Sequence, residues 1–393
     1  MKKVFLLLAL ASMVVACGGS SKNEGAPKST VATVDTLASS SDSLNLAKPE
    51  ATKPVTQPNN EIWYTSSDGK VVKPYKEGNG KFGAEIESNT YKNGKGIIKF
   101  QGDVTTIGDS AFCICSSLTS ITIPDSVTTI VGSAFMGCTN LTSITIPNSV
   151  KTIGWRAFWG CNNLTSVTIP DSVTTIGNEA FCVCDSLKEF NSKFASEDGR
   201  CLIIDGELVA FAPAGITKFT IPDSVTTIGE MAFCGCKSLT SITIPNSVTT
   251  IGDGAFWGCE SLKSVTIPNS VTTIEEHAFY VCKNLKSVTI PNSVTTIGNE
   301  AFCGCKSLTS ITIPNSVTTI GRCTFQYCSN LTSVTIPNSV TTIVYRAFQD
   351  CDNLTSVTIP NSVTTIEGEA FLGCDNLSEE TRKRIKSINP EAL

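Results

Sequence analysis

The feature that most constrains this chain is an internal repeat of 23 residues, which covers most of its length. A leucine returns at that interval in two runs, separated by one longer interval between Leu187 and Leu239. A fixed period of this size is typical of stacked coils, because one unit cannot bury its apolar face without a neighbour. The repeated leucines are Leu118, Leu141, Leu164, Leu187, Leu239, Leu262, Leu285, Leu308, Leu331, Leu354 and Leu377.

The course of one coil can be followed from Leu118 onward. Leu118, Ile121 and Ile123 alternate with Ser and Thr, which predicts a strand with one face turned inward. Pro124 ends the strand, because proline has no N–H to donate to a neighbouring strand. A second short extended stretch returns Ile130 to the interior, and an Ala-Phe pair followed by a Cys closes the coil. Stacked coils are expected to pair their strands in parallel, about 4.8 Å apart.

A phenylalanine and a cysteine also return once in each repeat. The Phe column is expected to form a buried, stacked spine, with each ring contributing about 1.5–3 kcal/mol. The Cys column is expected to be a buried row of weakly hydrogen-bonding side chains, most of them free thiols. Close pairs such as Cys113 and Cys115 recur in coils too far apart to share one metal ion, so no metal is expected. The columns are Phe112, Phe135, Phe158, Phe181, Phe233, Phe256, Phe279, Phe302, Phe325, Phe348 and Phe371, and Cys115, Cys138, Cys161, Cys184, Cys236, Cys259, Cys282, Cys305, Cys328, Cys351 and Cys374.

The repeat array, residues 98–377, is expected to carry caps, since its terminal coils would otherwise expose their cores. Residues 61–97 are interpreted as an N-terminal β cap with short strands, one of them at 71–72, and an Asn-Gly hairpin turn at 93–94. Residues 378–393 are expected to form a capping helix that follows a serine N-cap.

The period breaks once, between the two runs of leucines. Residues 196–212 predict a β-hairpin that turns at Asp205-Gly206. This insertion is expected to extend one coil without ending the domain.

The repeat consensus, L-x-x-[IV]-T-I-P-[ND]-S-V-T-T-I-G-x-x-A-F-x-x-C, resembles the BspA-like class of bacterial leucine-rich repeats over residues 98–377. The resemblance implies a repeat solenoid of parallel β-strands, with short extended and helical or turn segments on the other side of each coil. The chain departs from the commoner leucine-rich pattern, because Ser126, Ser149 and Ser172 stand where that pattern has Asn or Cys. Ser or Cys is therefore expected to make the turn hydrogen bonds. Proteins of this class are associated with attachment to host matrix proteins and to other bacteria.

The N-terminus has the pattern of an export signal. Two lysines precede an apolar run, so residues 1–16 are interpreted as a signal peptide. Cys17 follows a Val-Val-Ala sequence that resembles a bacterial lipobox, which implies a lipid-modified cysteine and a membrane anchor. Residues 17–60, rich in Ser, Thr and Pro, are expected to form a disordered tether. No Asp follows Cys17, which favours an outer-membrane or cell-surface lipoprotein if the cell has two membranes.

Composition argues against several functional classes. The net charge of −5 gives no general attraction to nucleic acid. The chain has one histidine, His277, on a position expected to be exposed, and no nucleophile, phosphate-loop or zinc motif. We therefore expect a monomer without enzymatic activity, cofactor or metal.

Binding candidates come from the positions that vary between repeats, just before and just after the Ala-Phe pair. Trp, Tyr and Arg are common anchors of binding sites, although these positions are also free to drift. The sequence predicts a binding protein for host or neighbouring-cell macromolecules, and the alternatives are a glycan-binding lipoprotein for nutrient capture and a structural surface component. The candidates are Trp155, Arg156, Trp159, Trp257, Tyr280, Arg322, Tyr345 and Arg346.

Overall fold

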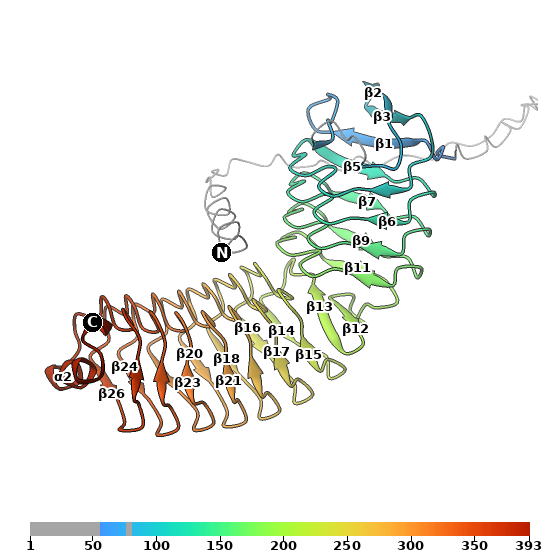
Figure 1. Ribbon diagram of the computed structural model, residues 1–393. Coiled ribbons are helices and arrows are strands. Elements are labelled where there is room, and N and C mark those ends of the chain that lie inside the picture. Colours follow the sequence, from blue (N-terminus) through green and yellow to red (C-terminus); the bar gives the residue numbers. More distant parts are fainter. Residues whose placement is uncertain (1–55, 76–80) are drawn as a thin grey trace, which may run out of the picture. The chain divides into compact units, whose positions relative to one another are not determined.

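The computed structural model describes residues 56–75 and 81–393. Over these residues the chain is a parallel-strand solenoid of about 11 turns of ~23 residues, with a C-terminal helix (Figure 1). The predicted fold class is confirmed. The interpretations of 1–16 as a signal peptide and of Cys17 as a lipid anchor fall outside the described residues, as does most of the 17–60 tether. The last residues of that segment are part of the N-terminal cap, because the Gln57 side chain donates to the Thr122 carbonyl oxygen at 3.0 Å and the Phe100 N–H donates to the Asn60 oxygen at 2.9 Å.

Each regular coil contributes one strand to each of two columns. Like residues pair with like in adjacent coils, as in Thr250 with Thr273, because each coil repeats the sequence of the last. The first column holds β5 (Leu118–Thr122), β7 (Ser143–Thr145), β9 (Ser166–Thr168), β11 (Glu189–Asn191), β14 (Lys218–Thr220), β16 (Ser241–Thr243), β18 (Ser264–Thr266), β20 (Ser287–Thr289), β22 (Ser310–Thr312), β24 (Ser333–Thr335) and β26 (Ser356–Thr358). The second holds β4 (Thr106–Ile107), β6 (Thr129–Ile130), β8 (Thr152–Ile153), β10 (Thr175–Ile176), β15 (Thr227–Ile228), β17 (Thr250–Ile251), β19 (Thr273–Ile274), β21 (Thr296–Ile297), β23 (Thr319–Ile320), β25 (Thr342–Ile343) and β27 (Thr365–Ile366).

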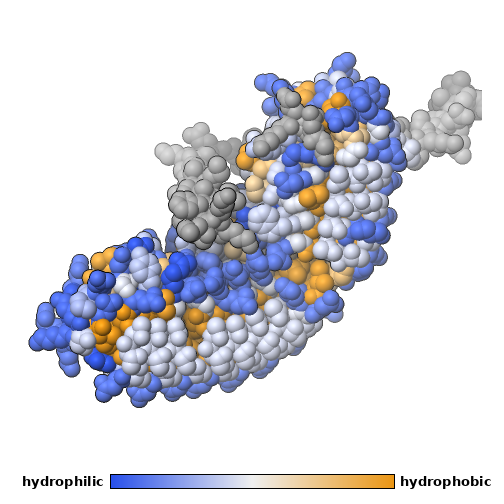
Figure 2. Space-filling model, in the orientation of Figure 1, coloured by the Kyte–Doolittle hydropathy of each residue, from blue (hydrophilic) through white to orange (hydrophobic). Residues whose placement is uncertain are grey.

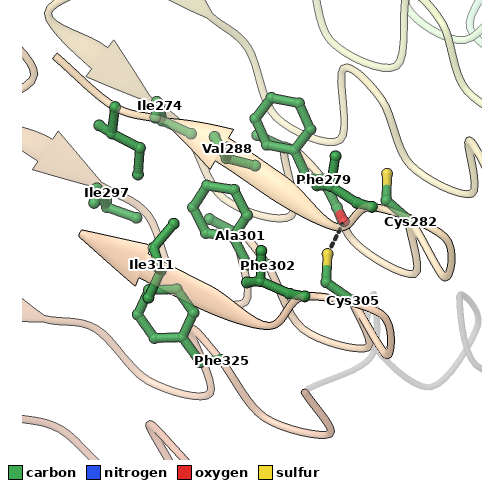
Figure 3. Packing of buried hydrophobic residues seen from close by; sticks show 14 of the residues in the cluster. Ile274, Phe279, Cys282, Val288, Ile297, Ala301, Phe302, Cys305, Ile311 and Phe325 are labelled. Carbon is green, nitrogen blue, oxygen red and sulfur yellow. Dashed lines mark hydrogen bonds between the residues drawn. The ribbon is translucent and has the colours of Figure 1, made fainter. Parts of the chain in front are cut away.

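The interior of the stack is filled by the Phe and Cys columns (Figure 3). The rings of Phe279 and Phe302 are 5.3 Å apart between centroids and 4° from parallel. The next pair, Phe302 and Phe325, is 5.7 Å apart and 7° from parallel. The Cys305 thiol donates to the carbonyl oxygen of Phe279 in the preceding coil at 3.2 Å. The predicted Phe spine and the buried, hydrogen-bonding Cys column are both confirmed.

The serine at the turn makes the expected hydrogen bond in the first coils and again at Ser316, whose hydroxyl donates to the Val294 carbonyl oxygen. The hydroxyls of Ser126, Ser149 and Ser172 donate to a valine carbonyl oxygen in the preceding coil at 2.7, 2.6 and 2.8 Å. Further along, the buried hydroxyls of Ser247 and Ser270 have no hydrogen-bond partner. The Cys thiol is therefore the more regular turn donor.

At the N-terminal end, an antiparallel sheet covers the first coil. β1 (Glu61–Ser66) pairs with β5, and β3 (Lys95–Phe100) lies between β1 and β2 (Ile86–Lys92). Asn93 and Gly94 form the predicted turn, with φ values of 51° and 78°. The strand predicted at residues 71–72 is wrong: this segment is irregular, and the Val72 N–H donates to the Tyr64 hydroxyl at 3.2 Å instead of to a strand.

The insertion forms the predicted hairpin of β12 (Cys201–Ile204) and β13 (Glu207–Phe211). It does more than extend a coil, because its two faces belong to different hydrophobic clusters. Leu202 and Ala210 pack with the coils before the hairpin, whereas Leu208 and Phe211 pack with the coils after it. The solenoid therefore has two hydrophobic cores, which share the hairpin as a wall.

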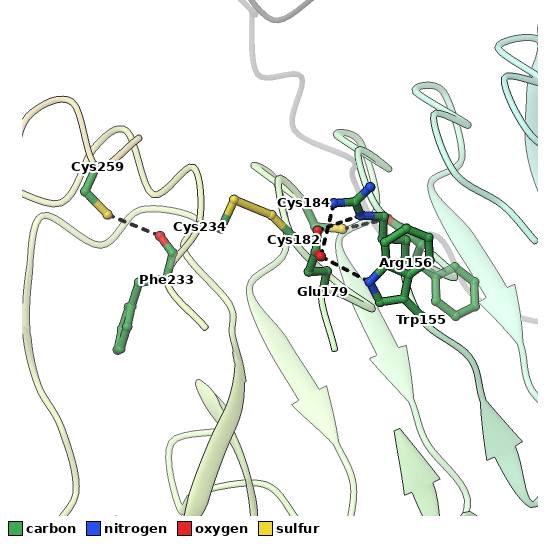
Figure 4. Close-up of a disulfide and its surroundings, with 9 residues drawn as sticks. Trp155, Arg156, Glu179, Cys182, Cys184, Phe233, Cys234 and Cys259 are labelled. Carbon is green, nitrogen blue, oxygen red and sulfur yellow. Dashed lines mark hydrogen bonds and ion pairs between the residues drawn. A yellow bond between two sulfur atoms is a disulfide. The ribbon is translucent and has the colours of Figure 1, made fainter. Parts of the chain in front are cut away.

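The ladder of main-chain hydrogen bonds at the Phe turn also stops at this junction. Elsewhere the N–H of each Phe donates to the following coil, as from Phe158 to the Ala180 oxygen at 2.8 Å. Among the described residues, no such bond joins 178–184 to 230–236. A disulfide between Cys182 and Cys234 links these turns instead (Figure 4). Most thiols are free, as expected, but this bond was not predicted.

The helix α2 (Glu379–Ile388) covers the last coil and is followed by a 3-10 turn, η2 (Pro390–Ala392). The Ser378 hydroxyl caps the helix by accepting from the Thr381 N–H at 3.2 Å. Ile385 is buried against the last coil, as the capping prediction requires. No helix in the described residues is long and apolar enough to span a membrane.

Removing the disulfide should loosen the junction. The Cys182→Ser/Cys234→Ser variant is expected to lose about 2–4 kcal/mol of unfolding free energy, because the crosslink no longer restricts the unfolded chain. Reductant should lower the melting temperature of the wild type and leave the variant unchanged. Unreduced, denatured wild type should show two fewer reactive thiols than the reduced protein, and equal thiol counts would refute the bond.

Candidate ligand-binding surface

The variable positions around each Ala-Phe pair form a band along the solenoid, here called the ribbon. The residue just before the pair has a left-handed backbone, with φ of 54° at Arg156, 54° at His277 and 57° at Arg346. This conformation is uncommon for residues other than glycine. Because it recurs in successive coils, side chains 23 residues apart start from equivalent places and lie beside one another.

Trp155 and Arg156 meet Glu179 of the next coil (Figure 4). The Arg156 Nε lies 2.6 Å from one carboxylate oxygen of Glu179, and its Nη2 lies 3.1 Å from the other. Trp155 donates to the same carboxylate at 3.1 Å, and the guanidinium lies 4.1 Å from its ring centroid. The charged side chains are only 6% and 5% exposed. The expectation that Arg156 is a surface residue is wrong, because this pair is buried within the stack.

A second cluster repeats this arrangement near the C-terminus. The Arg346 Nε lies 2.7 Å from Glu369 of the next coil, and the Tyr345 hydroxyl donates to the same carboxylate at 3.1 Å. Both charged side chains are 38% exposed, so this pair is in contact with solvent. Arg322 is bound similarly, 2.5 Å from Glu300. These candidates therefore join neighbouring coils to one another.

His277 lies at the centre of a third cluster, where the sequence predicted an exposed side chain placed by chance. Its Nδ1 is 3.0 Å from Asp253 and its Nε2 is 3.6 Å from Glu300, and the side chain is 16% exposed. Burial alone would lower the pKa of His277, but the hydrogen bonds and charges of the two carboxylates raise it to about 9. His277 is therefore a cation at neutral pH, held between acids of the two flanking coils.

Aromatic residues gather beside this histidine. The rings of Trp257 and Tyr280 are 4.3 Å apart, and the Trp257 ring is 5.3 Å from His277. Both aromatic side chains are partly exposed. Trp159, also partly exposed, occupies the same column on the other side of the Cys182–Cys234 disulfide. Of the five predicted aromatic anchors, the structure thus brings Trp257 and Tyr280 together and separates Trp159 from them.

Asp253 connects this cluster to an open groove of about 720 Å³. The groove crosses successive coils, and each coil contributes the same positions to its wall, mainly threonines and acidic or amide side chains. Its length along the stack makes it an extended site rather than an enclosed pocket. The lining residues are Asp253, Thr273, Glu275, Glu276, Thr295, Thr296, Ile297, Gly298, Asn299, Thr318, Thr319 and Gly321.

Sequence reasoning selected the aromatic and arginine residues of the ribbon but missed their acidic partners. The available signal was spacing, because Glu179 and Glu369 stand 23 residues after Arg156 and Arg346. Within the described part of the chain, no group of three or more His, Cys, Asp or Glu residues is placed to hold a metal ion.

The repeats match a known family of bacterial proteins. A family model described as BspA type leucine rich repeat region matches residues 84–197, 207–330 and 295–393, in six copies. These matches cover most of the chain, which therefore belongs to the BspA-type leucine-rich-repeat family. Leucine-rich-repeat solenoids are typically non-enzymatic and generally bind protein partners. None of the curated proteins compared with the chain matches it.

Three solved structures are similar to this chain. A leucine-rich repeat protein from Eubacterium ventriosum is 27% identical, with a TM-score of 0.54, over 71% of this chain and 76% of its own. A leucine rich cell surface protein from Faecalibacterium prausnitzii is 29% identical, with a TM-score of 0.50, over 66% of this chain and 71% of its own. The pneumococcal vaccine antigen PcpA shares the fold, at 22% identity and a TM-score of 0.50, over 77% of this chain and 85% of its own.

The two arginine clusters predict unequal effects of the same substitution. Arg156→Ala should lower the unfolding free energy by about 3–5 kcal/mol, because it leaves the buried Glu179 carboxylate without a cation and with only the Trp155 N–H to bond it. Arg346→Ala should have a much smaller effect, since water can solvate Glu369. Urea unfolding measures both variants. The additional change Glu179→Ala should restore part of the stability that Arg156→Ala loses, and equal losses in the two arginine variants would contradict this account.

The raised pKa of His277 predicts a pH-dependent stability. Protonated His277 stabilises the fold, and this contribution is complete below its unfolded pKa of about 6.5 and is lost as pH rises through about 9. Wild type should lose on the order of 1–3 kcal/mol more than His277→Gln across that window. Urea unfolding at several pH values tests this. The cysteines are the same in both proteins, so the difference between the two pH profiles reports on His277 alone. Parallel pH profiles for the two proteins would refute it.

Proposed function

We propose that this protein is a non-enzymatic recognition lipoprotein of the cell surface, anchored through Cys17 and held out by the segment between Cys17 and the N-terminal cap. Its function is to attach to proteins of the host or of neighbouring cells. The observation that carries this proposal is the groove beside Asp253, because it is open and runs across successive coils. The core of each coil is filled by its own apolar side chains, so the binding surface lies on the outside.

The groove favours an extended polypeptide with basic side chains. Asp253, Glu275 and Glu276 supply carboxylates along one wall, and threonine hydroxyls can bond a peptide backbone. The same negative charge disfavours nucleic acid. A row of equivalent positions suits many moderate contacts made by one monomer rather than a single deep anchor.

Glycan binding is a second candidate, favoured by the contact between Trp257 and Tyr280. Partly exposed aromatic rings offer large contact areas at a small cost in side-chain entropy. Trp257, Tyr280 and Trp159 therefore remain candidate anchors. Arg156, Arg322, Tyr345 and Arg346, together with Trp155, are better explained as links between coils, since each already bonds an acid.

Cells that display the full chain can separate these candidates. Purified extracellular-matrix proteins and a glycan array serve as probes. Asp253→Asn/Glu276→Gln should weaken binding of a matrix protein by about 1–3 kcal/mol, because each lost carboxylate removes a contact in the groove. Trp257→Ala should have a comparable effect on glycan binding if the aromatic pair is the site.

The control is Tyr327→Ala, which removes an exposed aromatic side chain outside the groove and should leave binding unchanged. Variant folding is checked by thermal melting. If neither set of substitutions changes ligand binding, this part of the ribbon is not the binding surface.

A further inference from the structure

The turn after the Cys column carries a local concentration of lysines. Two positions in each coil are involved, the one after the Cys and the one after the Leu. In four successive coils they carry five lysines, here called the lysine edge. The lysine edge is Lys237, Lys263, Lys283, Lys286 and Lys306.

Main-chain hydrogen bonds place these lysines in neighbouring coils. The Lys286 N–H donates to the Lys263 carbonyl oxygen at 2.8 Å, so these two side chains start side by side. The N–H of Ser307, the residue after Lys306, donates to the Lys283 oxygen at 3.0 Å. Lys283 is partly exposed and the other four lysines are exposed. Two acids lie beside these lysines. Glu260 is 2.8 Å from Lys283, and burial raises the pKa of Asp185 while the nearby charge of Lys237 lowers it. Five positive and two negative charges leave a net charge of +3.

The solenoid does not need the charges of Lys263 and Lys286. The neighbouring coils carry Thr240 and Thr309 at the position of Lys263 and Lys286, and the Thr240 hydroxyl donates to the preceding coil at 2.8 Å. Lysine cannot repeat that hydroxyl bond, and like charges on paired coils repel one another. An anionic partner would relieve this repulsion.

We propose that the lysine edge binds a linear anionic polysaccharide that carries sulfate or carboxylate groups, laid along the stack. Each of the four coils carries a lysine at one or both of the two positions, and coils recur about every 4.8 Å, which provides a staggered row of point charges for a polymer. Ser238, Ser261, Asn284 and Ser307 stand among the lysines and can bond sugar hydroxyls. This surface is distinct from the acidic groove, so it adds a second binding function to the one proposed above.

The chemistry of the lysine edge disfavours the other polyanions. Nucleic-acid surfaces pair basic side chains with aromatic residues on which bases stack, and no aromatic residue stands at these two positions in the four coils. Membrane-binding surfaces add apolar side chains that enter the lipid. None of the exposed large apolar side chains of the described residues belongs to this edge.

Heparin is the probe, and the purified full chain in detergent is the protein. Lys263→Thr/Lys286→Thr restores the residue of the flanking coils, so it should fold with at least wild-type stability. It should weaken heparin binding about tenfold or more at low salt, because two charge contacts are lost, and its affinity should depend less steeply on salt. Thr309→Lys, which extends the row beside Lys286, should tighten binding.

The control, Lys383→Gln/Lys386→Gln, removes two exposed charges from α2 and should leave heparin affinity within twofold of wild type. Unchanged heparin binding in the Lys263→Thr/Lys286→Thr variant would overturn the proposal. Equally tight binding of oligothymidylate or phosphatidylglycerol vesicles, lost in the same variant, would overturn the polysaccharide assignment. The Asp253→Asn/Glu276→Gln variant should bind heparin as wild type does, because the heparin site does not include the groove carboxylates.

Discussion

Every part of this structure depends on the contact of each coil with the next. Phe302 has no partner ring within its own coil, and it stacks on Phe279 before it and Phe325 after it. Main-chain N–H groups donate to the adjacent coil in the same way, and the Cys305 thiol donates to the preceding one. Because the Phe rings stack only on neighbouring coils and many main-chain N–H groups bond only across them, a coil without a neighbour would be unstable. The sheet at one end and α2 at the other supply that neighbour.

The same constraint decides which side chains of the ribbon can meet. Residues 23 apart are neighbours, so an arginine followed 23 residues later by a glutamate will pair, as Arg156 does with Glu179. Variation between repeats therefore does not indicate a free surface. Part of it encodes ionic links between particular coils, and His277 between Asp253 and Glu300 extends this to three coils in succession. Where a coil carries a charge with no such partner, as at Lys263, a role in binding is the better explanation.

The period was enough to predict the repeat fold, the Phe spine and the buried Cys column, because each follows from identical residues at identical places. For the ribbon, the sequence predicted which residues are candidates but not which of them contact one another. Placing Arg156 required knowledge of the next coil as well as its own, because Arg346 has the same left-handed backbone and yet is 38% exposed. The Cys182–Cys234 bond was beyond the repeat pattern, since these residues are 52 apart and become neighbours only around the hairpin. The strand predicted at residues 71–72 is absent, because the Val72 N–H bonds a tyrosine hydroxyl rather than a neighbouring strand.

At the hairpin the 23-residue repeat is interrupted, and the contacts between coils change there. The parallel stacking of the Phe rings ends there, since Phe181 packs edge-on against Phe190 at 70°. Among the described residues, the main-chain hydrogen bonds between neighbouring Phe turns are also missing at this point. The disulfide of Cys182 lies at this turn, and the buried pair formed by Glu179 is only three residues away. The Cys182–Cys234 bond thus joins the two Phe turns at the place where their main-chain hydrogen bonds stop. On the other side of the coil the main chain continues without a break, because β13 of the hairpin pairs in parallel with β15. The inserted hairpin therefore replaces one coil in the second strand column, and the disulfide replaces the missing contact between the Phe turns.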